Sequence, residues 1–293
     1  MSLPHVSPGF FYLICSVCCS VIVSVLLKFM RGAGVDLRQA IFSNYIVAAV
    51  LCWLIYVPSP VRELEHIHAW PLMLTLAVLL PAVFIALGQS VRYAGIVRSE
   101  VAQRLSLFIP LLAAFALFGQ ALTQRRGLAI LAACAALGCL LNRPGTSGKG
   151  EGGAGQGWVW PLSVWVGYGV IDILFKRLSQ TGTAFTAGLL GIFVLAAVLM
   201  LLYLLFARAQ WQMRTLAMGL TLGAMNFANI YTYIKAHQSL PHNPALVFAS
   251  MNLGVIALGT LIGAMAFREP LSRLNLLGLI LALAAIAAMM PSI

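Results

Sequence analysis

The sequence predicts an all-α integral membrane protein with ten transmembrane helices, arranged as two inverted five-helix repeats. First, 61% of its 293 residues are hydrophobic and only 9% are charged, with a mean hydropathy of +0.97. Second, apolar runs of about 20 residues alternate with short polar breaks along the chain. Third, similar residues recur at nearly the same offset in the two halves. One water-soluble core could not bury so much apolar surface.

The apolar runs divide the chain into five plus five. The first five lie near residues 9–31, 37–58, 69–93, 97–119 and 126–142, and the second five near 158–179, 183–207, 211–238, 243–267 and 273–291. Between them, RPGTSGKGEGGAGQG contains seven glycines and is typical of a flexible linker. We therefore expect a first repeat over 1–142, a linker over 143–157 and a second repeat over 158–293.

Two anchors support the repeat. Lys28 aligns with Lys176 at an offset of 148, and Phe118 aligns with Phe267 at an offset of 149. Because each repeat has an odd number of spans, the second enters the bilayer from the opposite side. Inverted repeats of this kind place a binding site near the middle of the membrane, between halves that move against each other.

Composition and motifs also argue against a nucleic-acid-binding protein, a metalloprotein and an enzyme. The net charge of +11 comes from basic residues scattered mostly between the apolar runs, which suits lipid headgroups rather than nucleic acid. All six cysteines lie inside apolar runs, where thiols usually pack as small hydrophobes, and His66 and His68 have too few neighbouring ligands for a metal site. No nucleotide-binding loop, HExxH or GxSxG motif occurs. We expect no enzyme activity, cofactor, metal or removed signal peptide.

The motifs FGQALTQ, from Phe118, and FREPLS, from Phe267, end long apolar runs. With these motifs the whole chain resembles the EamA family of the drug/metabolite transporter (DMT) superfamily. The resemblance implies a secondary carrier for small metabolites, often an exporter, in the bacterial inner membrane with cytoplasmic termini. The family's glutamate is matched by Glu269, whereas Gln120 replaces it in the first half. Counting basic residues between spans favours the opposite orientation.

The lysines at the repeated position are candidate substrate ligands. Asp172 lies four residues before Lys176, the favourable order for an ion pair on a helix, whereas Ser24 stands at the matching position before Lys28. We therefore expect an anionic group of the substrate to pair with Lys28. The alternative is that both lysines reach from their helix ends to the lipid headgroups.

Further polar residues interrupt the apolar runs. Asn226, Asn229 and Tyr233 recur at helical spacing with Lys235 beside them, which favours a cavity wall, or else hydrogen bonds between helices. Glu100 and Arg104 form a second pair at i,i+4, and Gln103 aligns with Asn252 across the repeat. The predicted substrate-binding residues are Lys28, Gln103, Arg104, Asp172, Lys176, Asn226, Asn229, Tyr233, Lys235 and Asn252.

These observations predict a secondary transporter that moves a small polar metabolite, zwitterionic or anionic, by alternating access. The expected partners are the lipid bilayer and this small-molecule substrate, and the prediction leaves room for a homodimer and for proton or counter-substrate coupling. Two alternatives remain open. The chain could be a flippase for a lipid-linked or phosphorylated headgroup, or a membrane partner subunit that transports nothing itself.

Overall fold

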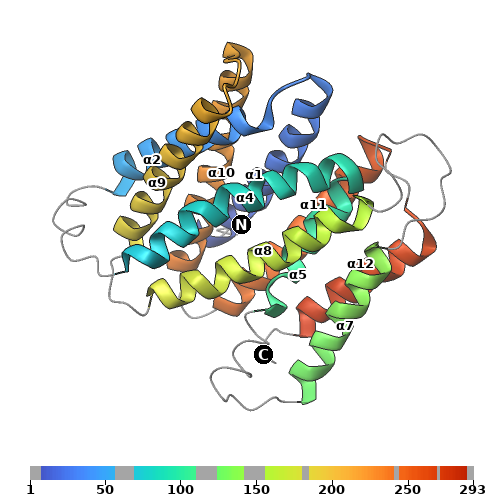
Figure 1. Cartoon of the computed structure of the whole chain (residues 1–293). Helices are drawn as coiled ribbons and strands as arrows, with labels where there is room; N and C mark the ends of the chain where they lie inside the picture. The colour runs from blue at the N-terminus through green and yellow to red at the C-terminus, as the bar shows by residue number, and fades with distance from the viewer. Residues whose placement is uncertain are drawn as a thin grey trace, which may run out of the picture.

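The computed structural model describes residues 8–56, 69–109, 124–141, 156–179, 185–240, 244–268 and 271–288. Within these ranges it contains α-helices and no strand (Figure 1), which confirms the prediction of an all-helical protein. The helices are α1 (Pro8–Gly32), α2 (Leu37–Tyr56), α4 (Trp70–Ala94), α5 (Ile96–Leu105), α7 (Gln124–Leu141), α8 (Gln156–Ser179), α9 (Phe185–Phe206), α10 (Met213–Ser239), α11 (Pro244–Met265) and α12 (Arg273–Ala288).

Local sequence explains several of the helix ends. Asp36 caps α2, because its side-chain oxygen accepts a hydrogen bond from the backbone N–H of Arg38 at 3.0 Å. Gly95 separates α4 from α5 with a φ of 91°, a backbone angle that glycine adopts without steric cost. Beyond α5, the hydroxyl of Ser106 donates to the carbonyl of Gln103 at 2.6 Å, which competes with the helical pattern. The helix of the fourth predicted span is therefore interrupted after Leu105, and helical residues begin again at Phe108 and Ile109.

Five helical segments are long and apolar enough to cross a membrane: Pro8–Met30, Leu37–Tyr56, Trp70–Ala94, Gly157–Phe175 and Ala187–Phe206. Shorter apolar helices cover Gly127–Cys139, Ser250–Met265 and Arg273–Ala288. Ten transmembrane helices and an inverted repeat stay predictions. The anchor Phe118, the residues Gln120 and Glu269, the histidines His66 and His68, and most of the linker lie outside the described residues.

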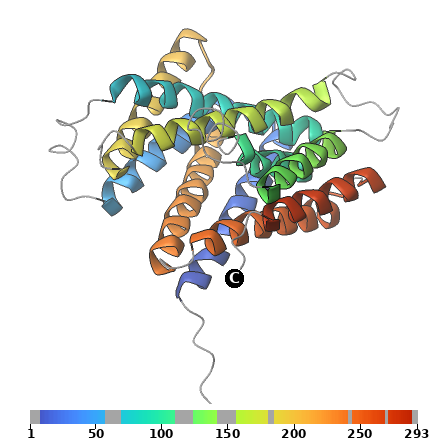
Figure 2. The ribbon, with the colours of Figure 1, turned by 90° about the horizontal axis from the view of Figure 1, so that it is seen from below.

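The helices pack mostly against partners that are distant in sequence. α10 lies between α1 and α2, α4 packs on α8 and α9, and α7 lies beside α12, as Figures 1 and 2 both show. The α10–α2 contact is close because glycines face it. A Cβ added at Gly219 would lie 2.6 Å from the carbonyl oxygen of Ala40, and one at Gly223 would lie 2.8 Å from that of Asn44. Small residues permit this approach of two backbones.

Several polar side chains lie inside this bundle together with its apolar core, and many large apolar side chains lie on its outer surface. Glu100 is 1% exposed and Asn44 is completely buried, whereas Leu131 is 67% exposed and Phe206 is 86% exposed. Water-soluble proteins usually show the reverse for charged residues, which are almost never fully buried unless paired. The fold thus gathers polar groups between helices whose outward faces are apolar.

Candidate functional site

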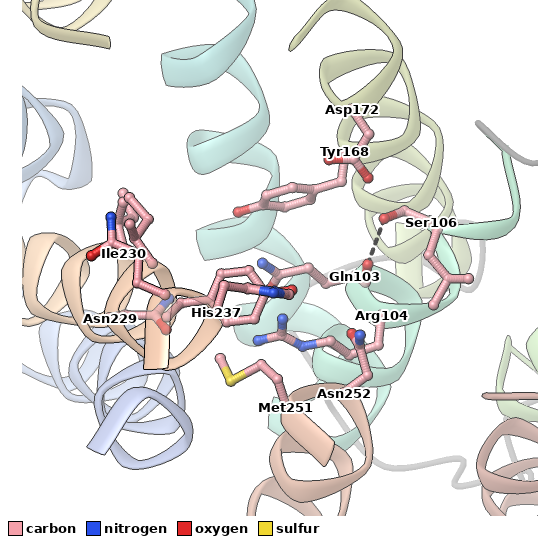
Figure 3. A pocket seen from close by; sticks show the side chains of 14 residues that line it. Gln103, Arg104, Ser106, Tyr168, Asp172, Asn229, Ile230, His237, Met251 and Asn252 are labelled. Carbon is pink, nitrogen blue, oxygen red and sulfur yellow. Dashed lines mark hydrogen bonds between the residues drawn. The ribbon is translucent and has the colours of Figure 1, made fainter. Parts of the chain in front are cut away.

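A cavity of about 570 Å³ lies between α5, α8, α10 and α11 (Figure 3). Six of the ten predicted substrate-binding residues line it, and all four helices contribute: Gln103 and Arg104, Asp172, Asn229 and Tyr233, and Asn252. The predicted grouping of these six side chains therefore agrees with the geometry of the cavity, although their role in binding stays a prediction.

Helical spacing aligns the lining residues. Asn229, Tyr233 and His237 follow one another at intervals of four on α10, so they share one face of that helix. The rings of Tyr233 and His237 meet edge to face with centroids 4.7 Å apart. Tyr168 and Asp172 are spaced in the same way on α8 and lie together in Figure 3, above Gln103 and Arg104. The cavity wall therefore consists of short polar stripes on helices that are otherwise largely apolar.

Arg104 supplies the positive charge of this wall. Its side chain is 13% exposed and extends into the space between Tyr168 and Met251 (Figure 3). One terminal nitrogen, Nη2, donates to the hydroxyl of Ser20 at 2.5 Å. Its Nε finds no hydrogen-bond partner among the described residues. The guanidinium thus borders the cavity while its buried Nε keeps a donor that the described residues leave unused.

Glu100 lies behind Arg104, one helical turn earlier on α5. The hydroxyl of Ser24 donates to Oε1 of Glu100, while Oε2 lies 3.8 Å from Nη2 of Arg104. That separation exceeds hydrogen-bond length, and Oε2 has no hydrogen-bond partner within the described part of the chain. The predicted i,i+4 pair is therefore present as a loose ion pair whose carboxylate is buried.

Asp172 supplies the negative charge on the facing helix. Asp172 is exposed and borders the cavity, and Arg104 is the charged group that acts on it among the described residues. The predicted ion pair with Lys176 cannot be described, since the Lys176 side chain lies outside the described part of the structure. One cationic and one anionic side chain thus border the same cavity.

Three other predicted residues do not line this cavity. The side-chain nitrogen of Asn226 donates to Oδ1 of Asn44 at 3.1 Å, which agrees with the alternative of a hydrogen bond between helices. The ammonium of Lys28 lies 4.3 Å from the centre of the Phe267 ring, and that of Lys235 lies 5.7 Å from the centre of the Tyr231 ring. Both lysines therefore contact aromatic faces away from the cavity.

Sequence reasoning missed a row of serines on α1. Ser16, Ser20 and Ser24 recur at intervals of four, so they share the face of α1 that meets the polar groups of the bundle. Ser16 donates to Oδ1 of Asn229 at 2.8 Å, while Ser20 and Ser24 bond Arg104 and Glu100. The spacing alone, S-x3-S-x3-S within an apolar run, could have identified this face. Tyr168 and His237 were missed as well, because aromatic residues also occur in apolar cores.

The arrangement can pair with both charges of a small molecule. Around Arg104 and Asp172, amides, phenol hydroxyls and an imidazole offer further hydrogen bonds. Among the described residues, no three His, Cys, Asp or Glu side chains are close enough to hold a metal ion. The site is therefore a polar pocket with one cation and one carboxylate, enclosed by helices whose outer faces are apolar.

Over the residues that the structure describes, the protein is all-helical, and five of its helices are long and apolar enough to span a membrane. No family model matches the chain. A protein of Haemophilus influenzae (strain ATCC 51907 / DSM 11121 / KW20 / Rd), described only as uncharacterized, is 46% identical over 280 residues, covering 94% of this chain and 95% of that protein. This chain belongs to the same family as that protein.

A solved crystal structure of another protein shares the fold. It covers 96% of this chain and 95% of its own length with a TM-score of 0.53 at 17% sequence identity. At that identity the similarity concerns the fold alone.

Proposed function

We propose that this protein is a membrane-embedded secondary transporter that moves a small polar metabolite carrying both a negative and a positive group. The observation that carries the proposal is the cavity between α5, α8, α10 and α11, where Arg104 and Asp172 border one space. Such a site recognises a zwitterion by pairing each of its charges with an opposite one. The surrounding amides and hydroxyls would fix its orientation.

The distribution of apolar surface supports a membrane location. Large apolar side chains such as Leu54, at 68% exposed, and Leu131, at 67%, point away from the bundle, while Glu100 and Asn44 lie inside it. In a bilayer the outward groups would contact lipid, and the inward polar groups would find partners within the protein. We propose that α7, α10, α11 and α12 also cross the membrane, and that α5, which has only ten residues, forms part of the remaining span. The membrane would be the inner membrane of a bacterium.

The pattern of helix contacts supports an inverted repeat. If α1, α2, α4, α5 and α7 correspond in order to α8, α9, α10, α11 and α12, each major contact has a counterpart. The α1–α10 contact corresponds to α8–α4, the α2–α10 contact to α9–α4, and the α1–α11 contact to α8–α5. The α2–α9, α5–α11 and α7–α12 contacts correspond to themselves. A two-fold relation between the halves would produce this pattern, and membership of the EamA family would agree with it.

A ligand screen tests the proposed site. The detergent-purified protein would be heated with amino acids, nucleosides, sugar phosphates or lipid headgroups, one at a time. A ligand at a hundred times its dissociation constant stabilises the folded state by about 2.7 kcal/mol, which raises the unfolding temperature measurably. We expect zwitterionic amino acids to stabilise the protein and Arg104→Ala to abolish that effect.

Two variants serve as comparisons for Arg104→Ala. Arg177→Ala removes an exposed arginine of α8 and should keep the ligand effect. Lys28→Ala decides between the cavity and the site predicted from the repeat, because Lys28 contacts Phe267 and does not line the cavity. If Lys28→Ala abolishes the ligand effect and Arg104→Ala keeps it, the proposed site is wrong. Stabilisation by phosphorylated headgroups alone would instead favour a flippase.

A further inference from the structure

Glu100, a buried carboxylate directly behind the cavity, has no role in the substrate pocket described so far. Glu100 is 1% exposed, and it packs so closely on α11 that a Cβ added at Gly259 would lie 3.2 Å from its Cγ. As an anion it is stabilised by the hydroxyl of Ser24 and by Arg104. Its Oε2 accepts no hydrogen bond from the described residues. Glu100 therefore depends on Arg104 for its counter-charge.

Arg104 serves two places at once. Inside the bundle, its Nη2 lies 3.8 Å from Oε2 of Glu100 and donates a hydrogen bond to Ser20. On its other side, Arg104 borders the cavity. An anionic group that enters the cavity would draw the guanidinium toward itself, because a direct charge-assisted hydrogen bond is stronger than the loose contact with Glu100. Glu100 would then be a buried carboxylate with Ser24 as its one strong partner. A buried charge without its counter-charge is unstable, and uptake of a proton removes it.

The groups around Glu100 are consistent with this exchange. From α1, Ser20 and Ser24 face the pair, and from α11, Gly259 contacts the glutamate side chain. From α8, Tyr168 interacts electrostatically with both Glu100 and Arg104, while Asp172 interacts with Arg104. No charged group of α4, α7 or α12 acts on Glu100 within the described ranges, where Arg104 is the charge that does. Arg104 is thus the charged group through which a bound anion could change the protonation of Glu100.

We propose, on the basis of the transport function above, that Glu100 binds a coupling proton and competes with the anionic group of the substrate for Arg104. Substrate and proton then bind together, because each substrate anion that occupies Arg104 favours protonation of Glu100. The proton comes from the water on the side to which the cavity opens and leaves on the other side with the substrate. A zwitterion and a proton therefore move in the same direction, and the step carries one net positive charge. Asp172 has the other task of pairing with the positive group of the substrate.

Proton flux in liposomes tests this coupling. The full chain would be reconstituted in phosphatidylethanolamine and phosphatidylglycerol, with the pH-sensitive dye pyranine inside and potassium plus valinomycin to dissipate the membrane potential. The probe is a uniformly 14C-labelled mixture of the protein amino acids, adjusted to the pH of the bath. We expect the mixture to acidify the interior of wild-type liposomes. Liposomes that contain Glu100→Gln should still exchange 14C-labelled amino acids across the membrane, at a rate that no longer depends on pH. Acidification of their interior should fall to the level of protein-free liposomes.

Asp36→Asn is the matched control, since it also replaces a carboxylate by an amide but in the turn between α1 and α2. It should acidify the interior as the wild type does. Acidification by Glu100→Gln, or wild-type exchange of label without acidification, would overturn the proton role of Glu100 and leave transport standing. If the wild type exchanges no label at all, the proposed transport of zwitterions is itself wrong and the coupling falls with it.

A measurement on the wild type covers the case in which Glu100→Gln does not fold. The amino-acid mixture would be added to purified protein in weakly buffered detergent solution, and the change in pH would be recorded. We expect each protein molecule that binds an amino acid to take up close to one proton from the solution. Release of protons, or an unchanged pH on binding, would contradict the proposal.

Discussion

The close contact between α10 and α2 makes a quantitative prediction at Gly219. A methyl group there would lie 2.6 Å from the carbonyl oxygen and 2.8 Å from the Cα of Ala40, both backbone atoms that cannot rotate away. Gly219→Ala must therefore push α10 away from α2, and such overpacking costs about 1–3 kcal/mol. Replacing a helical glycine by alanine recovers about 1 kcal/mol of helix propensity. Gly138→Ala on α7 is the matched control, because nothing lies within 4 Å of the added methyl and only the gain remains.

The comparison between these two variants isolates the steric cost. We expect Gly219→Ala to be less stable than Gly138→Ala by about 1–3 kcal/mol. At about 2–4 °C per kcal/mol, its unfolding temperature should be lower by roughly 2–12 °C. The assay is thermal unfolding of both purified variants in the same detergent, followed by tryptophan fluorescence. Equal unfolding temperatures would refute the close approach of α10 to Ala40.

Three further predictions follow from single contacts. Arg104→Ala leaves Glu100 buried without its counter-charge and should lower the free energy of unfolding by about 3–5 kcal/mol. In thermal unfolding, the double variant with Glu100→Gln should recover most of this lost stability. Asn226→Leu removes the donor to the buried Asn44 and should cost about 1–3 kcal/mol, but the double variant with Asn44→Leu should cost less than the two single changes together. Partial burial of the Asp36 carboxyl opposes its ionisation, but hydrogen bonds from the neighbouring arginine outweigh burial, so its pKa lies below the usual range. The stabilisation of the folded state by ionised Asp36 is therefore complete at neutral pH and is lost as the pH falls through this lowered pKa. When unfolding temperatures are measured at a series of pH values, Asp36→Asn should not show this loss of stability in acid.

Much of the fold could be predicted from the sequence, because hydropathy and helix-breaking residues act locally. The second span was expected at 37–58 and α2 covers Leu37–Tyr56, and the third was expected at 69–93 and α4 covers Trp70–Ala94. The break between the third and fourth spans falls at Gly95, whose positive φ ends one helix and begins the next. The fourth span is interrupted within the described residues, because α5 ends at Leu105 and helical residues begin again only at Phe108.

Part of the site could be predicted for a related reason. A polar side chain in an apolar helix must face other protein groups or a cavity, and this requirement is visible in the sequence. It selected Gln103 and Arg104 on α5 and Asn229 and Tyr233 on α10 as candidate ligands, and the structure places all four in the wall of one cavity. The serine row of α1 was equally visible, but single hydroxyls satisfy themselves within a helix so readily that they carry a weaker signal.

Hydropathy along the sequence is enough to predict apolar helices with polar residues that must be enclosed. Which polar residues meet depends on how the helices pack. Asn226 pairs with Asn44, 182 residues away, instead of facing the cavity, and Lys28 lies over the ring of Phe267. Arg104, in contrast, lies between a buried glutamate and an open cavity. Hydropathy states that a polar group needs a partner, whereas the rotation and packing of each helix determine which partner is within reach.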